Sequence, residues 1–396
     1  MGMIKQIKSF RINSTSVIAI IGIVLAAMLR FSLREFQSDD FHIFVHGWYQ
    51  TIKANGFGIF RTAFYDYTPP YLYILFLTSR ALPWLSDTVA TKIPSTVADF
   101  ICAWYGWRIV RLKYQSGPAP IFAALTLLFA PTVVFNSAFW GQTDMLYTAP
   151  LVAALYYVLR KEERSAWLAI GLAFSIKAQA IFIGPFLFAL LLRRELLWRN
   201  VVWAPIIWLA SLLPAWIAGR PIYELLTINP TQAALQTGKL TWNAPNLYKW
   251  IPREYAELFY PAGTFFAASV AIIFVAVIYT SRVRLTPSLR IGLALASVLI
   301  MPYVLPGMHD RYFFAADVIA ILFAFYVPSY CYLPLLIGMV SFLAYQPFLF
   351  KTDIVPMPYL ALSLLVGIVI LARWLVGTLY PTSGITTPDP ETDRSA

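Results

Sequence analysis

The sequence is poor in charged residues. Asp, Glu, Lys and Arg make up 12% of its 396 residues, about half of their share in soluble domains, whereas 59% of the residues are hydrophobic and 16% are aromatic. A soluble fold could not hide so much apolar surface from water. A spanning helix needs about 20 mostly apolar residues, and the chain offers many such stretches between short polar connections. The composition therefore excludes a soluble globular protein and predicts an all-α bundle of transmembrane helices.

Cysteine and histidine are also scarce. The two cysteines, Cys102 and Cys331, lie far apart inside apolar stretches, which argues against a disulfide framework and predicts two packed thiols. Among the three histidines, His42 and His46 have the i, i+4 spacing that can place two metal ligands on one helical face, close to Asp39. Because no clear third ligand follows, we expect no cofactor, with a divalent metal as the less favoured alternative.

Acidic residues are the scarcer of the two charges. The chain has 19 Asp and Glu against 30 Lys and Arg, a formal net charge of +11. The basic residues form small groups between apolar segments rather than one continuous face, so they do not indicate a nucleic-acid partner. Short loops rich in Lys and Arg stay in the cytoplasm, so four such groups mark that side of the membrane. They are Arg108-Arg111-Lys113, Arg160-Lys161-Arg164, Arg193-Arg194-Arg199 and Arg282-Arg284.

These markers predict about twelve spans, with a range of about 11 to 13. The first apolar segment, Ser14 to Leu33, follows three basic residues, and we expect an uncleaved anchor that leaves the N-terminus in the cytoplasm. The remaining spans are expected at 92–112, 118–135, 144–159, 166–192 as two short passes or a broken hairpin, 201–217, 262–281, 289–305, 313–327, 333–348 and 359–375.

Two long connections lie on the external side in this topology, residues 34–92 and residues 219–261. Within the first, Tyr71 to Leu85 is too short for a span, follows two prolines and is rich in aromatic residues, which predicts a helix in the outer interface. Residues 1–380 are expected to form a single transmembrane domain. The polar residues 381–396 are expected to be a disordered cytoplasmic tail.

The same topology brings scattered polar residues to the external face. They are Asp39, Asp40, Asp66, Asp144, His309, Asp310 and Arg311. A channel or transporter usually places its key charges near the bilayer midplane, so this gathering at one face favours an active site. Lys177 and Asp99 interrupt apolar segments instead, which predicts that each is paired or functional.

Five short segments contain most of these polar residues. In chain order they are Ser38 to Phe44, Tyr65 to Tyr71, Phe139 to Asp144, Lys177 to Ala180 and Met308 to Phe313. The first resembles the first-loop acidic motif of the GT-C glycosyltransferases, which draw their sugar from a polyprenyl phosphate. The second resembles the Tyr-Pro-Pro segment of the dolichyl-phosphate-glucose-dependent transferases. The third and fourth are similar to the Gly-Gln-Thr-Asp and Lys-Pro-Gln-Ala motifs of bacterial mannosyltransferase-like members, and the fifth to a His-Glu-Arg-Tyr motif with Asp310 in place of Glu.

The resemblance implies a GT-C type fold and inverting transfer of a hexose, with mannose expected, from a polyprenyl-phosphate sugar to an acceptor hydroxyl outside the membrane. A hydroxyl is a poor nucleophile at neutral pH, so a carboxylate must act as general base. Asp40 is the first candidate and Asp39 the second. Adjacent helical residues point about 100° apart, so we expect only one of the two to face the reacting atoms. The alternative is that these acids only cap a helix that begins near Phe41.

We also expect a set of substrate-binding residues, which lie in the five segments and, for Trp242 and Asn243, in the second long connection. They are His309, Asp310, Arg311, Tyr312, Lys177, Gln179, Gln142, Asp144, Asp66, Tyr67, Trp242 and Asn243. Arg311 suits bidentate contact with the leaving phosphate, with His309 and Lys177 as helpers. The alternatives are an interface anchor or an Asp310 partner for Arg311, an Asp144 or Asp99 partner for Lys177, and a helix cap for Asp144.

Asp66 and Tyr67 are expected to shape the lipid entrance rather than to react. Trp242 and Asn243 offer an aromatic platform and an amide for the acceptor or the sugar, or else belong to a loop packed by its own Trp. The expected partners are a polyprenyl-phosphate sugar, a glycan, lipid or protein acceptor and the bilayer of the cell membrane.

Two other functions explain many spans equally well. A lipid-linked sugar flippase or secondary transporter would favour internal repeats and charged midplane sites, and no convincing repeat is visible. An O-antigen ligase or polymerase would carry its large external loop later in the chain, whereas here the acid-bearing loop follows the first span directly.

Overall fold

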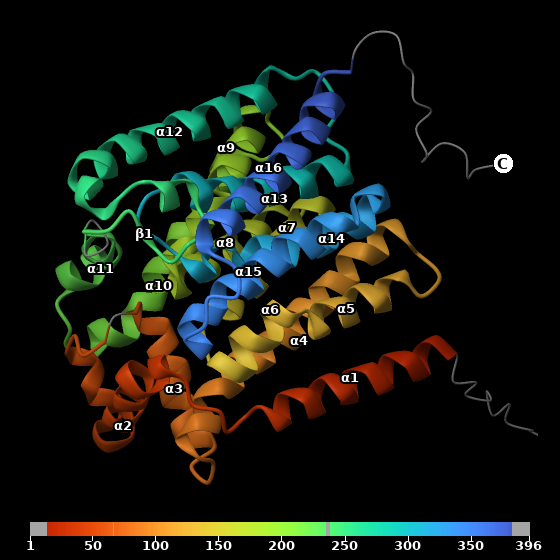
Figure 1. The fold of residues 1–396 in the computed structure, drawn as a ribbon. Helices are drawn as coiled ribbons and strands as arrows, with labels where there is room; N and C mark the ends of the chain where they lie inside the picture. The colour runs from red at the N-terminus through yellow and green to blue at the C-terminus, as the bar shows by residue number, and fades with distance from the viewer. Residues whose placement is uncertain (1–13, 66, 235–237, 382–396) are drawn as a thin grey trace, which may run out of the picture.

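The computed structural model describes residues 14–65, 67–234 and 238–381, and it is a bundle of helices (Figure 1). The α-helices are α1 Ser14–Ser32, α2 His46–Asn55, α3 Pro69–Ala81, α4 Asp87–Lys113, α5 Ala119–Phe129, α6 Pro131–Val134, α7 Asp144–Arg160, α8 Glu163–Ile176, α9 Gly184–Leu192, α10 Trp203–Ile217, α11 Ile222–Ala234, α12 Ala256–Thr280, α13 Pro287–Val304, α14 Phe314–Tyr326, α15 Tyr332–Phe350 and α16 Met357–Leu379. Residues 41–45 and 135–140 are π-helical, and short 3₁₀ turns lie at 56–61, 178–183, 198–200, 247–250, 253–255, 310–313 and 328–330.

The protein is a multi-pass membrane protein. Among the described residues, six helices are long and apolar enough to cross a bilayer, and a bent pair, 119–129 with 131–140, gives a seventh candidate. Every stretch that the sequence predicts as a span coincides with a helix or a helix pair. Helices α4, α7, α8 and α14 lie at such stretches but are too short or too polar for this criterion, so the count of about twelve spans stays a prediction.

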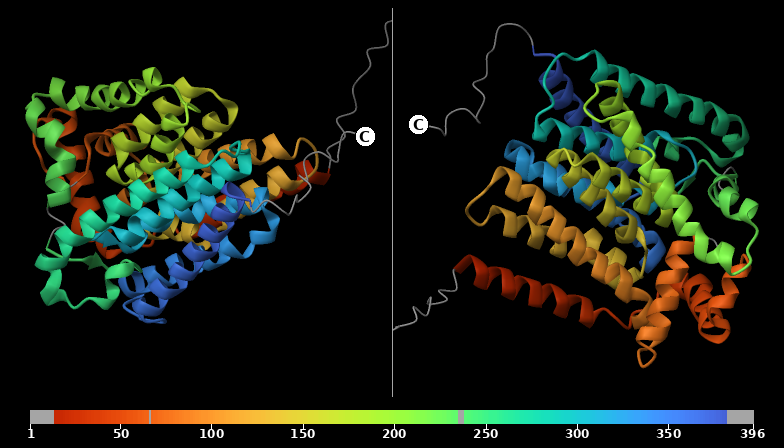
Figure 2. Two further views of the ribbon diagram at one scale, coloured as in Figure 1. Left: turned by 90° about the horizontal axis from the view of Figure 1, so that it is seen from above. Right: turned by 180° about the vertical axis from the view of Figure 1, so that it is seen from behind.

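Charged loops gather at one end of the bundle. Arg193, which follows α9, donates to the carbonyls of Ile278, Ser281 and Val283 at the end of α12 at 2.7–3.0 Å. Arg290 donates to Glu195 at 2.6 Å. The N-terminus of α1 and the C-terminus of α16 lie at this end, whereas α2, α3, α11 and β1 lie at the other (Figure 1). Helices α1 and α12 form opposite edges of the bundle (Figure 2).

The segment predicted as one span at 118–135 is broken. Helix α5 ends at Phe129, Ala130 is extended with ψ of 125°, and Pro131 begins α6 after a bend of 49°. Proline fits the first turn of a helix, where its missing N–H is not needed. The π-helix that follows ends at Gly141 in the left-handed region with φ of 81°, a conformation that glycine adopts without strain. This break carries Trp140 and Gln142 to the end of the bundle that holds α2.

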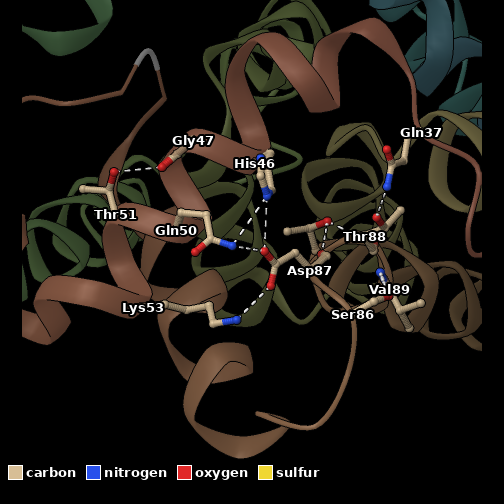
Figure 3. A network of polar contacts seen from close by, with 11 residues as sticks. Gln37, His46, Gly47, Gln50, Thr51, Lys53, Ser86, Asp87, Thr88 and Val89 are labelled. Atoms are coloured by element: carbon tan, nitrogen blue, oxygen red, sulfur yellow. Dashed lines mark hydrogen bonds and ion pairs between the residues drawn. The ribbon is translucent and has the colours of Figure 1, made fainter.

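The first long connection is folded against α4. Its helix α3 begins at Pro69 and ends at Ala81, so it starts two residues before the predicted interfacial helix and ends four residues earlier. At the start of α4, the Asp87 carboxylate accepts from Lys53 at 2.9 Å and from Gln50, both on α2, and lies 3.4 Å from His46 (Figure 3). These contacts fix α2 on the end of α4.

The second long connection contains a small pairing that the sequence did not predict. Strands β1 (Thr241–Trp242) and β2 (Met308–His309) pair in parallel, with Trp242 opposite His309. A strand of two residues is too short to show an alternating pattern in the sequence, so only its pairing in the folded protein identifies it. The rest of the connection is largely helical, and α12 begins at Ala256, before the predicted span.

The two cysteines and the predicted C-terminal tail lie outside the candidate site. Cys102 is buried as predicted, but Cys331 is exposed at the start of α15, so the prediction of two packed thiols is wrong for Cys331. The predicted tail lies outside the described residues, apart from residue 381.

Candidate active site

Asp40 lies where two distant segments meet. It directly precedes the π-helix at 41–45, and its side chain makes no capping hydrogen bond. Its Oδ2 atom instead accepts from Trp140 Nε1 at 2.9 Å and from Gln142 Nε2 at 2.5 Å. Its side chain keeps 17% of its surface exposed. The capping alternative therefore does not describe Asp40, whose carboxylate is held by side chains about 100 positions away in the chain.

Asp39 has a different environment. Its Oδ2 atom is paired with Lys351 Nζ at 2.5 Å, and the two side chains are 52% and 66% exposed. Lys351 follows α15, so this pair joins the first connection to the α15–α16 turn. The neighbouring acids thus face separate partners, and only Asp40 lies with the other candidate residues.

Asp144 and Lys177 form a buried ion pair. Asp144 Oδ1 contacts Lys177 Nζ, and its Oδ2 accepts from Asn136 Nδ2 at 2.8 Å, with none of the Asp144 side chain exposed. Lys177 ends α8 in an extended conformation, which turns its side chain toward α7. Of the two partners considered for Lys177, the structure has Asp144. Asp144 is the first residue of α7, but its side chain pairs with Lys177 and does not cap the helix.

Arg311 joins the two carboxylates. Its Nη1 lies 3.9 Å from Asp40 Oδ2, and its Nε lies 3.7 Å from Asp144 Oδ2. Burial opposes the charged form, but Tyr67, Asp144, Asp40 and Asp310 together raise the pKa of Arg311. In the described part of the chain the Nε atom has no hydrogen-bond partner. The guanidinium therefore keeps donors for an anionic ligand beside Asp40.

The residues before Arg311 have strongly shifted pKa values. Burial raises the pKa of Asp310 to about 7, an effect that Arg311 partly offsets, and Asp310 Oδ1 accepts from the Arg311 backbone N–H at 2.8 Å. Burial, with Arg311, Lys177 and Lys239, lowers the pKa of His309 to about 3. His309 is therefore neutral at pH 7.

The β1–β2 pairing brings the second connection to this site. The rings of Trp242 and His309 stack at 5.5 Å with an angle of 8°, and the Lys239 ammonium lies 3.7 Å from the Trp242 ring centre. Asn243 forms an isolated bridge with His309 and is 3.5 Å from Lys249 Nζ. Trp242 therefore packs on His309, another candidate residue, and its contact with the acceptor or the sugar stays a prediction.

Gln179 and Tyr312 complete the side of the site near Lys177. Their side chains are hydrogen-bonded, and within the described ranges the buried Gln179 Oε1 has no partner. The Lys177 ammonium lies 5.7 Å from the ring centre of Tyr67. Asp66, the remaining candidate, lies outside the described residues.

The two nearby histidines do not form a shared site. His42 is exposed, and His46 contacts Asp87 and Gln50 instead (Figure 3). Among the residues that the structure describes, no group of three His, Cys, Asp or Glu side chains could hold a metal ion.

Sequence reasoning missed two residues that hold site carboxylates and one that pairs with a buried carboxylate elsewhere in the bundle. Trp140 donates to Asp40, and Asn136 donates to Asp144. Arg30 pairs with Asp99 at 2.7 Å. Trp140 stands inside one of the five segments, and an arginine within the first predicted span was a visible signal for a buried partner. The prediction that Asp99 is paired is therefore confirmed.

Comparisons with known proteins agree with the fold. Residues 68–218 match the family model of dolichyl-phosphate-mannose-protein mannosyltransferases. The chain is similar to a crystal structure of ArnT from Cupriavidus metallidurans bound to undecaprenyl phosphate, with a TM-score of 0.58 and 16% identity over 92% of this chain and 72% of ArnT. The apo ArnT structure has a TM-score of 0.43 and 16% identity over 93% and 78%. No curated protein matches the sequence.

Both the family model and the ArnT fold bear on the resemblance found in the five segments. The family model begins at Thr68, so it covers the second segment in part. It covers the third and fourth segments, which end at Asp144 and Ala180, in whole. The ArnT likeness extends over almost the whole chain. The resemblance is therefore confirmed: the protein has the fold of the GT-C glycosyltransferases that use polyprenyl-phosphate sugars.

Proposed function

We propose that the protein is an inverting glycosyltransferase that moves a hexose, with mannose as our choice, from a polyprenyl-phosphate sugar to an acceptor hydroxyl outside the membrane. Asp40 carries this proposal. It is a partly exposed carboxylate that lies beside the donor-rich Arg311 and the buried Lys177–Asp144 pair. The ArnT of similar fold was crystallised with undecaprenyl phosphate, which supports a polyprenyl phosphate as the lipid here.

Asp40 is the general base in this proposal. Among the contacts of the described residues, both side-chain hydrogen bonds to Asp40 reach Oδ2. Oδ1 is therefore the oxygen that takes the proton from the acceptor hydroxyl. The acceptor oxygen then bonds to the anomeric carbon as the bond from that carbon to the phosphate oxygen breaks. The electron pair leaves with the phosphate, and the configuration at the anomeric carbon inverts.

Arg311 and Lys177 receive the leaving phosphate. The Arg311 contacts with Asp40 and Asp144 are 3.9 and 3.7 Å long, longer than hydrogen bonds, so its N–H groups keep their capacity for phosphate oxygens. Lys177 has three N–H donors and adds a second positive charge from the next segment. Gln142, Gln179 and Trp242 would then contact the sugar, with Tyr67 at the lipid entrance.

The site lies outside the cell in this proposal, and both termini lie in the cytoplasm. The basic loops that contact one another through Arg193 and Arg290 mark the cytoplasmic end. The candidate residues occupy the opposite end, with α2, α3 and β1 (Figure 1). About twelve helices of one domain cross the membrane, and α3 lies in the outer interface.

The direct test is transfer by the purified protein in liposomes. Synthetic polyprenyl-phosphate mannose, glucose and galactose, each with a labelled sugar, are supplied with membrane acceptors. We expect labelled product from the mannose donor, with inverted anomeric configuration. No transfer from any donor, together with movement of lipid-linked sugar across the liposome membrane, would replace this proposal with the flippase alternative.

A further inference from the structure

One face of α4 carries a row of buried polar residues. Thr88, Lys92, Ser95 and Asp99 are spaced by four, three and four residues, so they follow one face of the helix. Their exposed fractions are 3%, 4%, 1% and 1%. Polar groups inside a membrane bundle are expensive unless they are paired, so each needs a partner. We call these four residues the α4 polar row.

The first two residues of the α4 polar row hold the segment that carries Asp40. Thr88 accepts from Gln37 Nε2 at 2.9 Å (Figure 3). Lys92 Nζ donates to the carbonyl of Phe36 at 2.6 Å and to that of Leu33 at 3.3 Å. Lys92 thereby adds a side-chain donor to two carbonyls just beyond the end of α1, and it fixes the chain four residues before Asp40.

The other two residues hold the segment that carries Trp140 and Gln142. Ser95 Oγ donates to the Gln142 carbonyl at 2.7 Å. Ser137 Oγ, in the π-helix, donates to Asp99 Oδ2 at 2.5 Å, and the same oxygen accepts from Arg30 Nε at 2.7 Å. One helix face therefore contacts both segments that converge on Asp40.

The two segments also contact each other directly above this face. Ser38 Oγ donates to the Trp140 carbonyl at 3.0 Å, and the rings of Phe36 and Phe139 stack at 3.6 Å. Gly141 lies over the Lys92 stem, where an added Cβ would be 3.4 Å from its carbons. The two segments therefore contact each other as well as α4, and a shift of residues 136–142 would carry the donors of Asp40 with it.

We propose that the α4 polar row is a positioning device, in which Lys92 and Ser95 set the placement of Asp40 against Trp140 and Gln142. This inference rests on the proposed function for its kinetic consequence. None of these residues is among the proposed substrate-contacting residues. A displacement of about 1 Å in a catalytic group can reduce turnover on the order of 10²-fold, so a hydrogen bond to a backbone carbonyl affects turnover without contacting the reactants.

The main test compares Ser95→Ala with Thr91→Ala. Thr91 is a matched control, because it is 3% exposed on the same helix and, among the described residues, its hydroxyl bonds only to the carbonyls of its own turn, Asp87 and Thr88. We expect Ser95→Ala to lower kcat by about tenfold or more with the KM for the lipid donor within about twofold of wild type. Thr91→Ala is expected to keep the wild-type kcat.

A double-mutant cycle separates positioning from a general structural effect. If Ser95 acts by placing Gln142, the change Ser95→Ala has little further effect on kcat once Gln142 is alanine. Equal loss in both backgrounds would overturn the proposal, as would a Ser95→Ala variant that behaves like Thr91→Ala.

Hydrogen exchange gives a readout that needs no activity. We expect amides of residues 136–142 to exchange faster in Ser95→Ala, and amides of residues 36–42 to exchange faster in Lys92→Met, with Thr91→Ala unchanged. Unchanged exchange in both variants would contradict the positioning role. Wild-type protein that transfers no sugar would contradict the proposed function instead, and the exchange result would still decide whether the α4 polar row orders the two segments.

Discussion

The indole N–H of Trp140 donates a 2.9 Å hydrogen bond to the Asp40 carboxylate across 100 positions of the chain. This bond orients the carboxylate, and a general base must be oriented toward the proton that it takes. The same oxygen, Oδ2, also accepts from the side-chain amide of Gln142. Among the contacts of the described residues, Oδ2 is therefore held and Oδ1 is available. This arrangement separates Asp40 from Asp39, which the sequence alone could not do.

The Asp39–Lys351 pair is expected to contribute little. Exposed ion pairs are typically worth about 0–1 kcal/mol, and these side chains are 52% and 66% exposed. We therefore expect Asp39→Asn and Lys351→Met to keep sugar transfer within about threefold of wild type. A loss on Asp39→Asn as large as that on Asp40→Asn would show that the general base has been assigned to the wrong acid.

The Lys177–Asp144 pair should behave in the opposite way. Removing one partner of a buried pair leaves an uncompensated charge, at a cost of about 3–5 kcal/mol. We expect Lys177→Met to lower the stability of the purified protein strongly, and the double variant Lys177→Met/Asp144→Asn to recover much of it. The thermal unfolding midpoint in detergent measures both. A double variant no more stable than Lys177→Met would mean that charge pairing is not what Lys177 supplies.

Asp310 should make stability fall as pH rises from about 4 to about 7. In this range the folded protein holds a proton on Asp310, whose pKa is raised to about 7, whereas the unfolded chain with its ordinary pKa does not. Folding is therefore favoured at the acid end of the window. We expect Asp310→Asn to gain stability relative to wild type between about pH 5 and about pH 7.5, measured by the unfolding midpoint.

His309 provides the matched comparison for this pH effect. Its pKa is lowered to about 3, so between about pH 3 and pH 6.5 the unfolded chain binds a proton that the folded protein does not. Its contribution to stability therefore rises with pH in that window. We expect the His309→Gln variant to lose stability relative to wild type as the pH rises from about 3 to about 6.5. Parallel pH profiles for the two variants would contradict these assignments.

Thiol labelling tests the orientation. Cys331 is exposed near the end of α14, whose Tyr326 carbonyl accepts from Lys113 of a basic group, and Cys102 is buried. Gly58 is exposed in the first long connection and has open space for a side chain. With intact cells and a membrane-impermeant maleimide, we expect Gly58→Cys to react and Cys331 to react only after permeabilisation. Labelling of Cys331 in intact cells would reverse the topology.

Hydropathy and loop charge predicted the helices and the polar face well, because both depend on local composition. The choice between Asp39 and Asp40 depends on Trp140 and Lys351, which no local pattern connects to them. The break at Pro131 and the pairing of Trp242 with His309 likewise depend on tertiary contacts. Arg30 was the clearest missed signal, since an arginine in a span requires a partner, and Asp99 was already identified as needing one.

The most direct test of the account is sugar transfer by Asp40→Asn beside a measurement of donor binding. The amide keeps the shape of the carboxylate and cannot take the acceptor proton, so we expect transfer to fall by about 10²–10⁴-fold while the polyprenyl-phosphate sugar still binds. Transfer close to the wild-type rate, with donor binding unchanged, would contradict the assignment of Asp40 as the general base.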